Sequence, residues 1–175
     1  MKSPVYNVTG VPVEQVHANS YNPNHVAPPE MRLLELSVWE DGYTQPCVTY
    51  KISDDNYEIV DGFHRFILQD KSSKYFSQRI YDREKGILPV VVIDKPLEGR
   101  IASTIRHNRA RGSHSIELMS NIVSELKESG MSDAWIMKEI GMDKDELLRL
   151  KQITGLASLF ADKEFSECQE DKTND

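Results

Sequence analysis

The segment from residue 57 to residue 66, Tyr-Glu-Ile-Val-Asp-Gly-Phe-His-Arg-Phe, puts a glycine, a histidine and an arginine directly after a short apolar run. Ile59 and Val60 are typical of a strand, and the apolar residues after Arg65 indicate a helix. A strand-to-helix corner offers an anion its backbone N–H groups and the positive end of a helix dipole. The segment therefore predicts an anion-binding corner. The alternative is a hairpin end at which Arg65 pairs with a surface acid.

The individual residues of this corner suit phosphate chemistry. Glycine permits close backbone approach, and arginine offers planar donors that match two phosphate oxygens. His64 can donate a hydrogen bond or carry a proton near neutral pH. Asp61 directly precedes Gly62, so its carboxylate is a candidate for binding Mg²⁺ or for capping the following helix. Asp61 and His64 are the candidate catalytic residues, and other candidates for a catalytic base are Glu30, Glu35 and Glu58.

A second cationic segment runs from Gly99 to Ser115 and contains no acid. Its cations are Arg100, Arg106, Arg109 and Arg111, with His107 and His114. The net charge of the whole chain is −7, so this local excess of positive charge favours a ligand or partner surface. The cluster could form the second wall of a phosphate pocket, contact a nucleic-acid backbone, or be a solvated helix end. The two histidines lack metal-binding spacing, and no metal site is predicted.

Composition narrows the class of protein. The 175 residues contain two cysteines and no Cys-x-x-Cys pair, so a disulfide framework or a zinc site of thiolates is unsupported. Cys47, in an apolar stretch, is expected to be a buried structural thiol. No run approaches the roughly 18–20 apolar residues of a membrane helix. The start of the sequence has no apolar signal core, so we expect a cytoplasmic protein without a membrane span.

Periodicity and turn residues predict the elements that position these side chains. We expect a hairpin of two strands directly before the glycine corner, a third strand after a polar loop or lid, and a series of helices. In order, the predictions are a helix at 30–39, strands at 47–52 and 57–60, a helix at 63–69, a loop at 71–85, a strand at 88–93 and helices at 97–107, 116–128, 133–140 and 144–152.

The last three helices are joined by tight glycine turns and resemble a helix-turn-helix unit. The presumed recognition helix, residues 143–152, carries three acids and three bases. Helices that read bases usually lie in a basic surface, so contact with protein is as consistent with this helix as contact with DNA. Residues 161–175 are expected to be an acidic flexible tail.

The order of these motifs resembles the ParB/sulfiredoxin-like superfamily over roughly residues 9–115. The run from Ser103 to Gly112 looks most like the IbrB-like branch, and the trailing helices occupy the place of the ParB helix-turn-helix. The matching stretches are Val13–Pro23, Gly42–Val48, Tyr57–Phe66, Leu88–Ile93 and Ile101–Arg111. The resemblance implies an α/β (α+β) fold: a small mixed sheet within residues 1–115, a three-helix appendage at 116–160, and the tail at 161–175.

In that superfamily the Gly-x-x-Arg corner binds nucleotide phosphates. ParB proteins bind CTP there and clamp DNA, sulfiredoxins bind ATP, and another relative phosphorylates free serine. The resemblance therefore implies a nucleoside triphosphate, ATP or CTP, with Mg²⁺ as a companion ion. The residues implied to hold the nucleotide are Gly62, Phe63, His64, Arg65, Arg106, Asn108, Arg109 and Arg111.

Two departures from the superfamily patterns bear on activity. Phe63 replaces both the cysteine of the sulfiredoxin pattern Gly-Cys-His-Arg and the glutamate of the ParB pattern Gly-Glu-Arg-Arg. Sulfiredoxin-type reduction therefore lacks its nucleophile. The ParB segment Glu-Asn-Leu-Gln-Arg keeps Asn108 and Arg111, but His107 replaces the glutamate tied to metal and nucleotide. Nucleotide hydrolysis or kinase-like activity is left open.

The resemblance implies a nucleotide-binding regulator, or a phosphoryl-handling component, of a two-protein system that acts on DNA. Its implied partner is similar to phosphoadenosine-phosphosulfate reductases, and a homodimer is a further expectation. Two alternatives stay open. One is a DNA-binding transcriptional regulator that uses the arginine cluster and the C-terminal helices. The other is an interaction scaffold whose pocket has degenerated.

Overall fold

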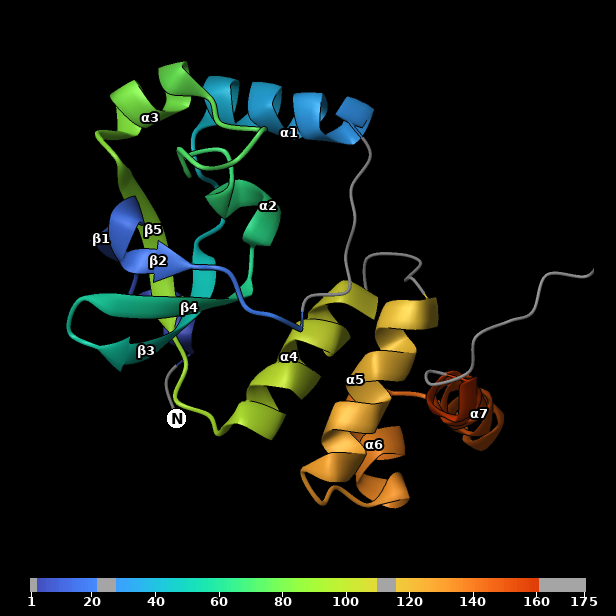
Figure 1. Cartoon of the computed structure of the whole chain (residues 1–175). Coiled ribbons are helices and arrows are strands. Elements are labelled where there is room, and N and C mark those ends of the chain that lie inside the picture. Colours follow the sequence, from blue (N-terminus) through green and yellow to red (C-terminus); the bar gives the residue numbers. More distant parts are fainter. Residues whose placement is uncertain (1–2, 22–27, 110–115, 161–175) are drawn as a thin grey trace, which may run out of the picture.

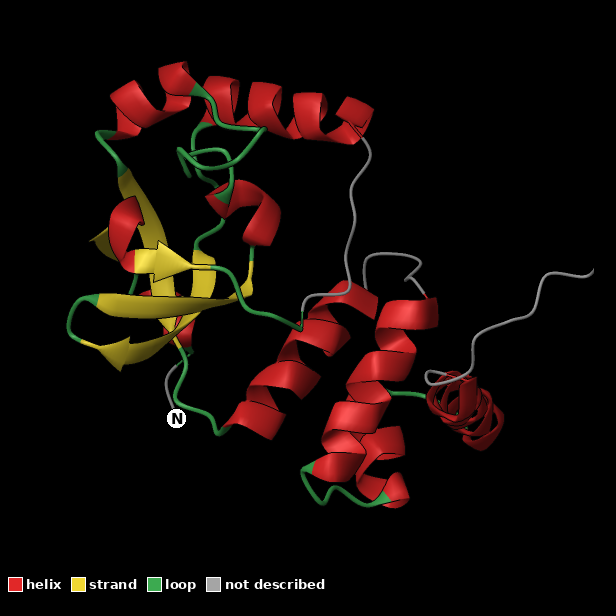
Figure 2. Ribbon diagram, in the orientation of Figure 1, coloured by secondary structure: helices red, strands yellow, loops and turns green. Residues whose placement is uncertain are grey.

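The computed structural model describes residues 3–21, 28–109 and 116–160. Within these ranges the chain forms one mixed sheet, with short helices above it and a group of helices beside it (Figures 1 and 2). This arrangement confirms the predicted fold class, a small mixed sheet followed by a helical appendage.

The sheet has five strands in the order β1-β5-β3-β4-β2. β3 and β4 form the predicted antiparallel hairpin, which turns at Asp54 and Asp55. β3 also pairs in parallel with β5, so the hairpin lies in the middle of the sheet. The two short strands at the edges are β1, antiparallel to β5, and β2, parallel to β4. The strands are β1 (Thr9–Pro12), β2 (Val16–His17), β3 (Cys47–Ser53), β4 (Asn56–Asp61) and β5 (Ile87–Val92).

Three α-helices lie on the N-terminal side of the structure, with α1 and α3 uppermost in Figure 1 and α2 beneath them. They are α1 (Pro28–Asp41), α2 (Phe63–Phe66) and α3 (Gln78–Glu84), and two 3₁₀ turns, η1 (Pro4–Tyr6) and η2 (Val13–Gln15), flank β1. α2 is shorter than predicted, because the N–H of Gln69 bonds to the carbonyl of Phe66 in a tight turn.

The prediction of a loop over residues 71–85 is wrong in its second half, where α3 forms. The helix presents one fully buried apolar side chain, Ile80, and is otherwise polar. Arg83 donates to the carbonyl oxygens of Val38 and Trp39 at the end of α1. Both Arg79 and Arg83 place their guanidinium groups over the ring of Trp39. Contacts with α1, rather than a periodic apolar pattern, therefore stabilise α3.

The helices of the C-terminal part are α4 (Leu97–Arg109), α5 (Ile116–Glu128), α6 (Asp133–Ile140) and α7 (Lys144–Phe160). The predicted caps are present: the Ser132 hydroxyl accepts the N–H of Trp135, and the Asp143 carboxylate accepts the N–H of Glu146. α7 runs eight residues beyond the predicted end, Gln152. Within the described ranges, every helix is too short or too polar to span a lipid bilayer.

Two apolar clusters form the core. The first lies between the sheet and helices α1 to α3 and includes Cys47, Ile59 and Leu88. The second lies among α4 to α7 and includes Ile101, Ile105 and Leu126. α4 joins the two parts, because it supplies Ile101 and Ile105 to the second cluster while its Thr104 hydroxyl donates to a carbonyl of β4. The sheet and the helix-turn-helix are thus packed against opposite sides of one helix.

Candidate functional site

The predicted strand-to-helix corner is present at the end of β4, where Gly62 adopts a left-handed backbone conformation (φ 92°, ψ 20°). A Cβ atom at this position would lie 2.9 Å from both the Arg65 Nη2 and the Cys47 Sγ, and 3.2 Å from the Cys47 Cα. Glycine is therefore required twice, by its dihedral angles and by the close approach of β3. Burial raises the pKa of the Cys47 thiol to about 12, so the neutral thiol lies under the corner as a structural group.

Arg65 turns inward. Its Nη1 donates to the carbonyl oxygens of Gln45 (2.5 Å) and Pro46 (3.1 Å), and its side chain is 13% exposed. Its Nη2 lies 3.8 Å from the Asp61 Oδ2. The guanidinium thus fastens the segment before β3 to the corner. Arg65 does not form the surface ion pair of the alternative prediction, because the carboxylate beside it, Asp61, is 8% exposed.

The end of α4 lies beside the same corner, where His107 contacts Asp61, 46 positions earlier in the sequence. The His107 Nδ1 lies 3.2 Å from the Asp61 Oδ2. Asp61 is buried, whereas the His107 side chain is 42% exposed. The N-cap of α2 is Gly62 rather than Asp61. Asn108, another predicted site residue, is buried next to His107. Asp61, Gly62, Arg65 and His107 are therefore brought together, and the predicted set of binding residues does not include His107.

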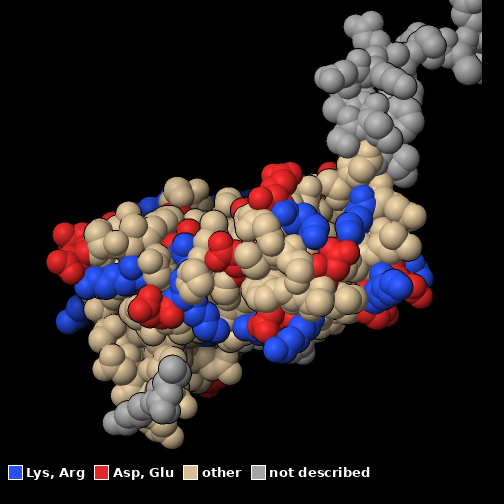
Figure 3. Space-filling model, turned by 90° about the horizontal axis from the view of Figure 1, so that it is seen from below, with Lys and Arg blue, Asp and Glu red and all other residues tan. Residues whose placement is uncertain are grey.

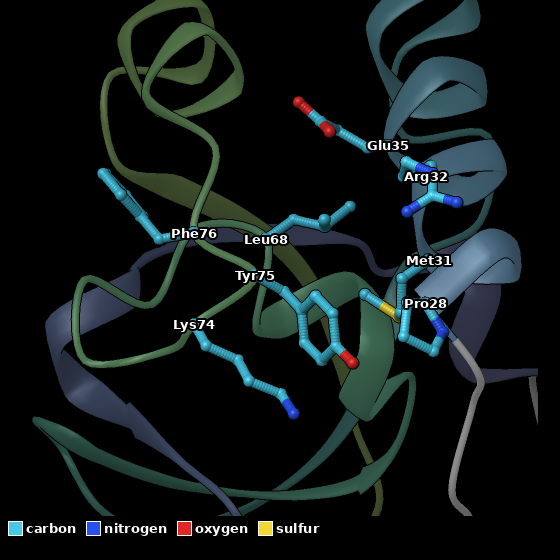
Figure 4. A pocket seen from close by; sticks show the side chains of 8 residues that line it. All are labelled: Pro28, Met31, Arg32, Glu35, Leu68, Lys74, Tyr75 and Phe76. Atoms are coloured by element: carbon cyan, nitrogen blue, oxygen red, sulfur yellow. The ribbon is translucent and has the colours of Figure 1, made fainter.

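Phe63 and His64 follow the corner on α2. Their rings meet edge to face with centroids 5.4 Å apart, and both side chains are half-buried. Phe63 also lines an open hollow of about 530 Å³ between α2 and the segment around β2. A smaller hollow of about 220 Å³ lies between α1 and residues 74–76 (Figure 4), where Tyr75 points across from the loop toward Met31 on α1.

Arg100 and Arg106 of the cationic segment both pair with acids elsewhere in the chain. The Arg106 Nη1 donates to the main-chain carbonyl (2.7 Å) and the carboxylate (2.9 Å) of Glu139, and so ties α4 to α6. Arg100 pairs with Glu58 at 2.5 Å and lies over the ring of Tyr50. The segment from Gly99 to Ser115 contains no acid of its own, and the acidic partners of these two arginines are distant in the sequence. Arg109 is the last residue of α4, and Arg111 and His114 lie outside the described residues.

Two of the other candidate bases, Glu58 and Glu35, have structural partners. Glu58 accepts the hydroxyl of Tyr21 at 2.9 Å as well as the guanidinium of Arg100. Burial, and then the hydrogen bond to Glu58, raise the pKa of Tyr21. Glu35 accepts from Ser77 and Arg79. In the part of the chain that the structure describes, no three His, Cys, Asp or Glu side chains gather as a metal site would require.

Comparison with known proteins identifies the family of the chain. Residues 2–74 match the ParB N-terminal domain, and residues 114–162 match the IbrB-like C-terminal HTH domain. The chain is 50% identical over 165 residues to "Uncharacterized protein YbdM" of Escherichia coli (strain K12), a match that covers 94% of this chain and 77% of that protein. The chain belongs to the ParB-like family. The resemblance stated from the motifs is thereby confirmed.

Solved structures support the fold of this ParB-like protein. The C-terminally truncated chromosome-partitioning protein ParB from Caulobacter crescentus, complexed to the centromeric parS site, is 16% identical with a TM-score of 0.52. That match covers 83% of this chain and 71% of the ParB chain. The same ParB complexed with CTP-γ-S is 16% identical with a TM-score of 0.46, covering 88% of this chain and 83% of that one. The parS-bound structure shares the fold.

The helix-turn-helix of this ParB-like protein has a balanced surface. Lys127 and Lys151 each lie 2.9 Å from the carboxylate of Asp133, and their hydrogen bonds lower its pKa. Lys151 of α7 is thus paired within the domain, while Lys144 and Arg149 stay exposed. Figure 3 shows positive and negative side chains interspersed over one face of the molecule. That face has no broad area of a single sign.

Proposed function

We propose that this ParB-like protein binds a nucleoside triphosphate, CTP or ATP, at the corner between β4 and the end of α4. The observation that carries the proposal is the conformation of Gly62. Its backbone is left-handed, and the atoms around it leave no room for a Cβ. Close approach of the main chain to phosphate oxygens requires such a residue. The corner also lies inside the region that matches the ParB N-terminal domain.

The binding residues that the geometry favours are Gly62, Phe63 and His64, with Asn108 alongside. Arg65 supports them from below, because its Nη1 is engaged by two main-chain carbonyls. Arg106 is engaged by Glu139, and we assign it to the joint between α4 and α6 instead. Mg²⁺ would arrive with the phosphates, since protein sites for this ion supply one or two carboxylates and leave the rest to phosphate and water.

We further propose that the output of binding is regulation in a DNA-associated system, in which residues 1–115 hold the nucleotide and residues 116–160 form the helix-turn-helix. A ParB of shared fold was solved on its parS DNA, and the IbrB-like HTH match covers the C-terminal helices. The resemblance to the IbrB-like branch implies a partner similar to phosphoadenosine-phosphosulfate reductases, and self-association as a dimer belongs to the same proposal.

Direct DNA recognition by α7 alone is the second candidate function, and the helix-turn-helix match favours it. Two exposed cations, Lys144 and Arg149, are available on this helix. Two phosphate contacts predict a slope of about −2 in a plot of log affinity against log salt concentration. Duplex binding measured by fluorescence anisotropy at several salt concentrations tests this. A steep slope would assign DNA binding to a larger surface than α7.

Thermal shift with CTP, ATP and GTP, each at 1 mM with MgCl₂, tests the nucleotide proposal. A ligand at about 100 times its dissociation constant stabilises by about 2.7 kcal/mol. For a chain of this length that corresponds to a rise in melting temperature of about 5–10 °C. We expect this shift in the wild type and a smaller one in Arg65→Lys, which loses the planar fork of donors.

Arg149→Ala is the matched control, because it removes an exposed arginine from α7, far along the chain from the corner. It should keep the full nucleotide shift. A wild-type protein that none of the three nucleotides stabilises would refute the proposal. An equal shift in Arg65→Lys and wild type would contradict the supporting role of Arg65 in nucleotide binding.

A further inference from the structure

His107 and Asp61 form a pair that neither the family matches nor the predicted site accounts for. The Asp61 Oδ2 lies 3.2 Å from the His107 Nδ1 and 3.8 Å from the Arg65 Nη2. An ionised carboxylate can only accept hydrogen bonds, so the proton of the neutral imidazole is on Nδ1. The Nε2 then carries a lone pair that can accept a proton. The carboxylate thus fixes which ring nitrogen is basic.

His107 is more exposed to solvent than Asp61, as a residue that transfers protons to and from water must be. The Asp61 side chain is 8% exposed, whereas the His107 side chain is 42% exposed. Among the described residues, His107 has no second polar partner. The guanidinium of Arg65, 3.8 Å from the same Asp61 Oδ2, offsets the negative charge of the buried carboxylate. A buried, charge-compensated carboxylate that orients a solvent-facing imidazole is the arrangement of a general base.

A purely structural role for His107 is less consistent with the contacts of α4. Two other polar contacts already fasten this helix to β4. The hydroxyl of Thr104 donates to the Val60 carbonyl at 2.6 Å, and Arg100 pairs with Glu58 at 2.5 Å. The Thr104 and Arg100 side chains are 2% and 12% exposed, so both contacts are buried between α4 and β4. His107 is the exposed member of the series, and its partner Asp61 directly precedes Gly62.

We propose that His107 is the proton acceptor for hydrolysis of the nucleotide bound at this corner, and that Asp61 is its positioning residue. This inference rests on the proposed function. The oxygen of a water molecule forms a bond to the γ-phosphorus, and the bond from that phosphorus to the β–γ bridging oxygen breaks. The electron pair leaves on the β-phosphate. The proton of the water passes to the His107 Nε2 and then to solvent, giving a nucleoside diphosphate and phosphate.

The replacement of the ParB glutamate by His107 therefore has a different meaning from the one that the motif alone suggests. On the motif, the loss of a carboxylate at this position weakens the case for hydrolysis. In the structure, the position is filled by a base whose carboxylate comes from β4 instead. The substrate class is a nucleoside triphosphate, with water as the co-reactant.

The test measures binding and turnover separately in four proteins: wild type, His107→Gln, Asp61→Asn and Thr104→Val. Binding is measured by thermal shift with CTP and with ATP in the presence of MgCl₂, and turnover by release of phosphate. We expect the wild type and Thr104→Val to bind and to release phosphate at similar rates. His107→Gln should bind and release phosphate about 100-fold more slowly, as loss of a general base predicts.

Thr104→Val is the matched control because it removes the neighbouring docking contact of α4 and keeps the shape of the side chain. A role for His107 in docking alone would make the two variants alike. Asp61→Asn is followed by ¹⁵N NMR of the imidazole, since an amide N–H facing Nδ1 moves the ring proton to Nε2. The same variant should slow phosphate release.

Turnover at the wild-type rate in His107→Gln would overturn the inference, as would a wild type that binds nucleotide and releases no phosphate. An unchanged tautomer in Asp61→Asn would remove the positioning role. Failure of every nucleotide to raise the melting temperature of the wild type would instead refute the proposed function, and the inference with it. The two failures are therefore distinguishable.

Discussion

Replacing Gly62 by alanine tests the physical basis of the site. Two separate costs are expected. A residue other than glycine in the left-handed region, here at φ 92°, costs about 1–2 kcal/mol. The added methyl group would also lie 2.9 Å from the Cys47 Sγ and 3.2 Å from the Cys47 Cα. Overpacking of this kind typically costs about 1–3 kcal/mol. Gly62→Ala should therefore lower the free energy of unfolding by about 2–5 kcal/mol.

Gly42→Ala separates the two costs. Gly42 has a similar backbone conformation (φ 77°), but a Cβ atom added there would meet nothing within 4 Å, so only the conformational cost applies. Urea denaturation followed by far-ultraviolet circular dichroism gives both values on one scale. The difference between the two variants should be about 1–3 kcal/mol, the overpacking cost alone. Equal destabilisation by the two substitutions would refute the close approach of β3 to the corner.

Other predictions concern two ion pairs away from the corner and the thiol of Cys47 beneath it. Glu58→Gln should lower the free energy of unfolding by about 3 kcal/mol in urea denaturation, because it leaves Arg100 largely buried without its counter-charge. Arg106→Ala should cost only about 0.5–1 kcal/mol, since its ion pair is about one-third exposed. In a Cys168→Ser background, Cys47 should not react with a thiol reagent at pH 8, because its raised pKa of about 12 and its burial keep it a protected thiol. The pKa of the Cys47 thiol is higher in the folded protein than in the unfolded chain, so the unfolded chain loses this proton first as pH rises. The free energy of unfolding should therefore fall as pH rises above about 9.

Local signals predict most of the elements. The caps at Ser132 and Asp143 act within three residues, so their sequence neighbours suffice to place the starts of α6 and α7. The β3–β4 hairpin likewise follows from alternation on either side of a polar turn. The glycine corner is predictable for the same reason, since one glycine between a strand and a helix is a local signal.

Pairings between distant residues are not predictable in this way. Arg106 meets Glu139 over 33 positions and His107 meets Asp61 over 46, and no local pattern encodes either contact. Sequence neighbours alone therefore make the arginine run look unpaired. Local patterns also miss α3, because one buried isoleucine, Ile80, gives no apolar period. The stability of α3 comes from Arg83 and the end of α1, which are brought together only by the fold.

A nucleoside triphosphate is expected to bind where β4 meets the end of α4. A ¹H–¹⁵N correlation spectrum of the labelled protein, recorded with increasing CTP and separately with ATP in MgCl₂, tests this most directly. We predict the largest shifts at the amides of Gly62, Phe63, His64 and His107, and little change at the amides of α3. Shifts concentrated on α7 or on α3, or no shifts with either nucleotide, would contradict binding at this corner.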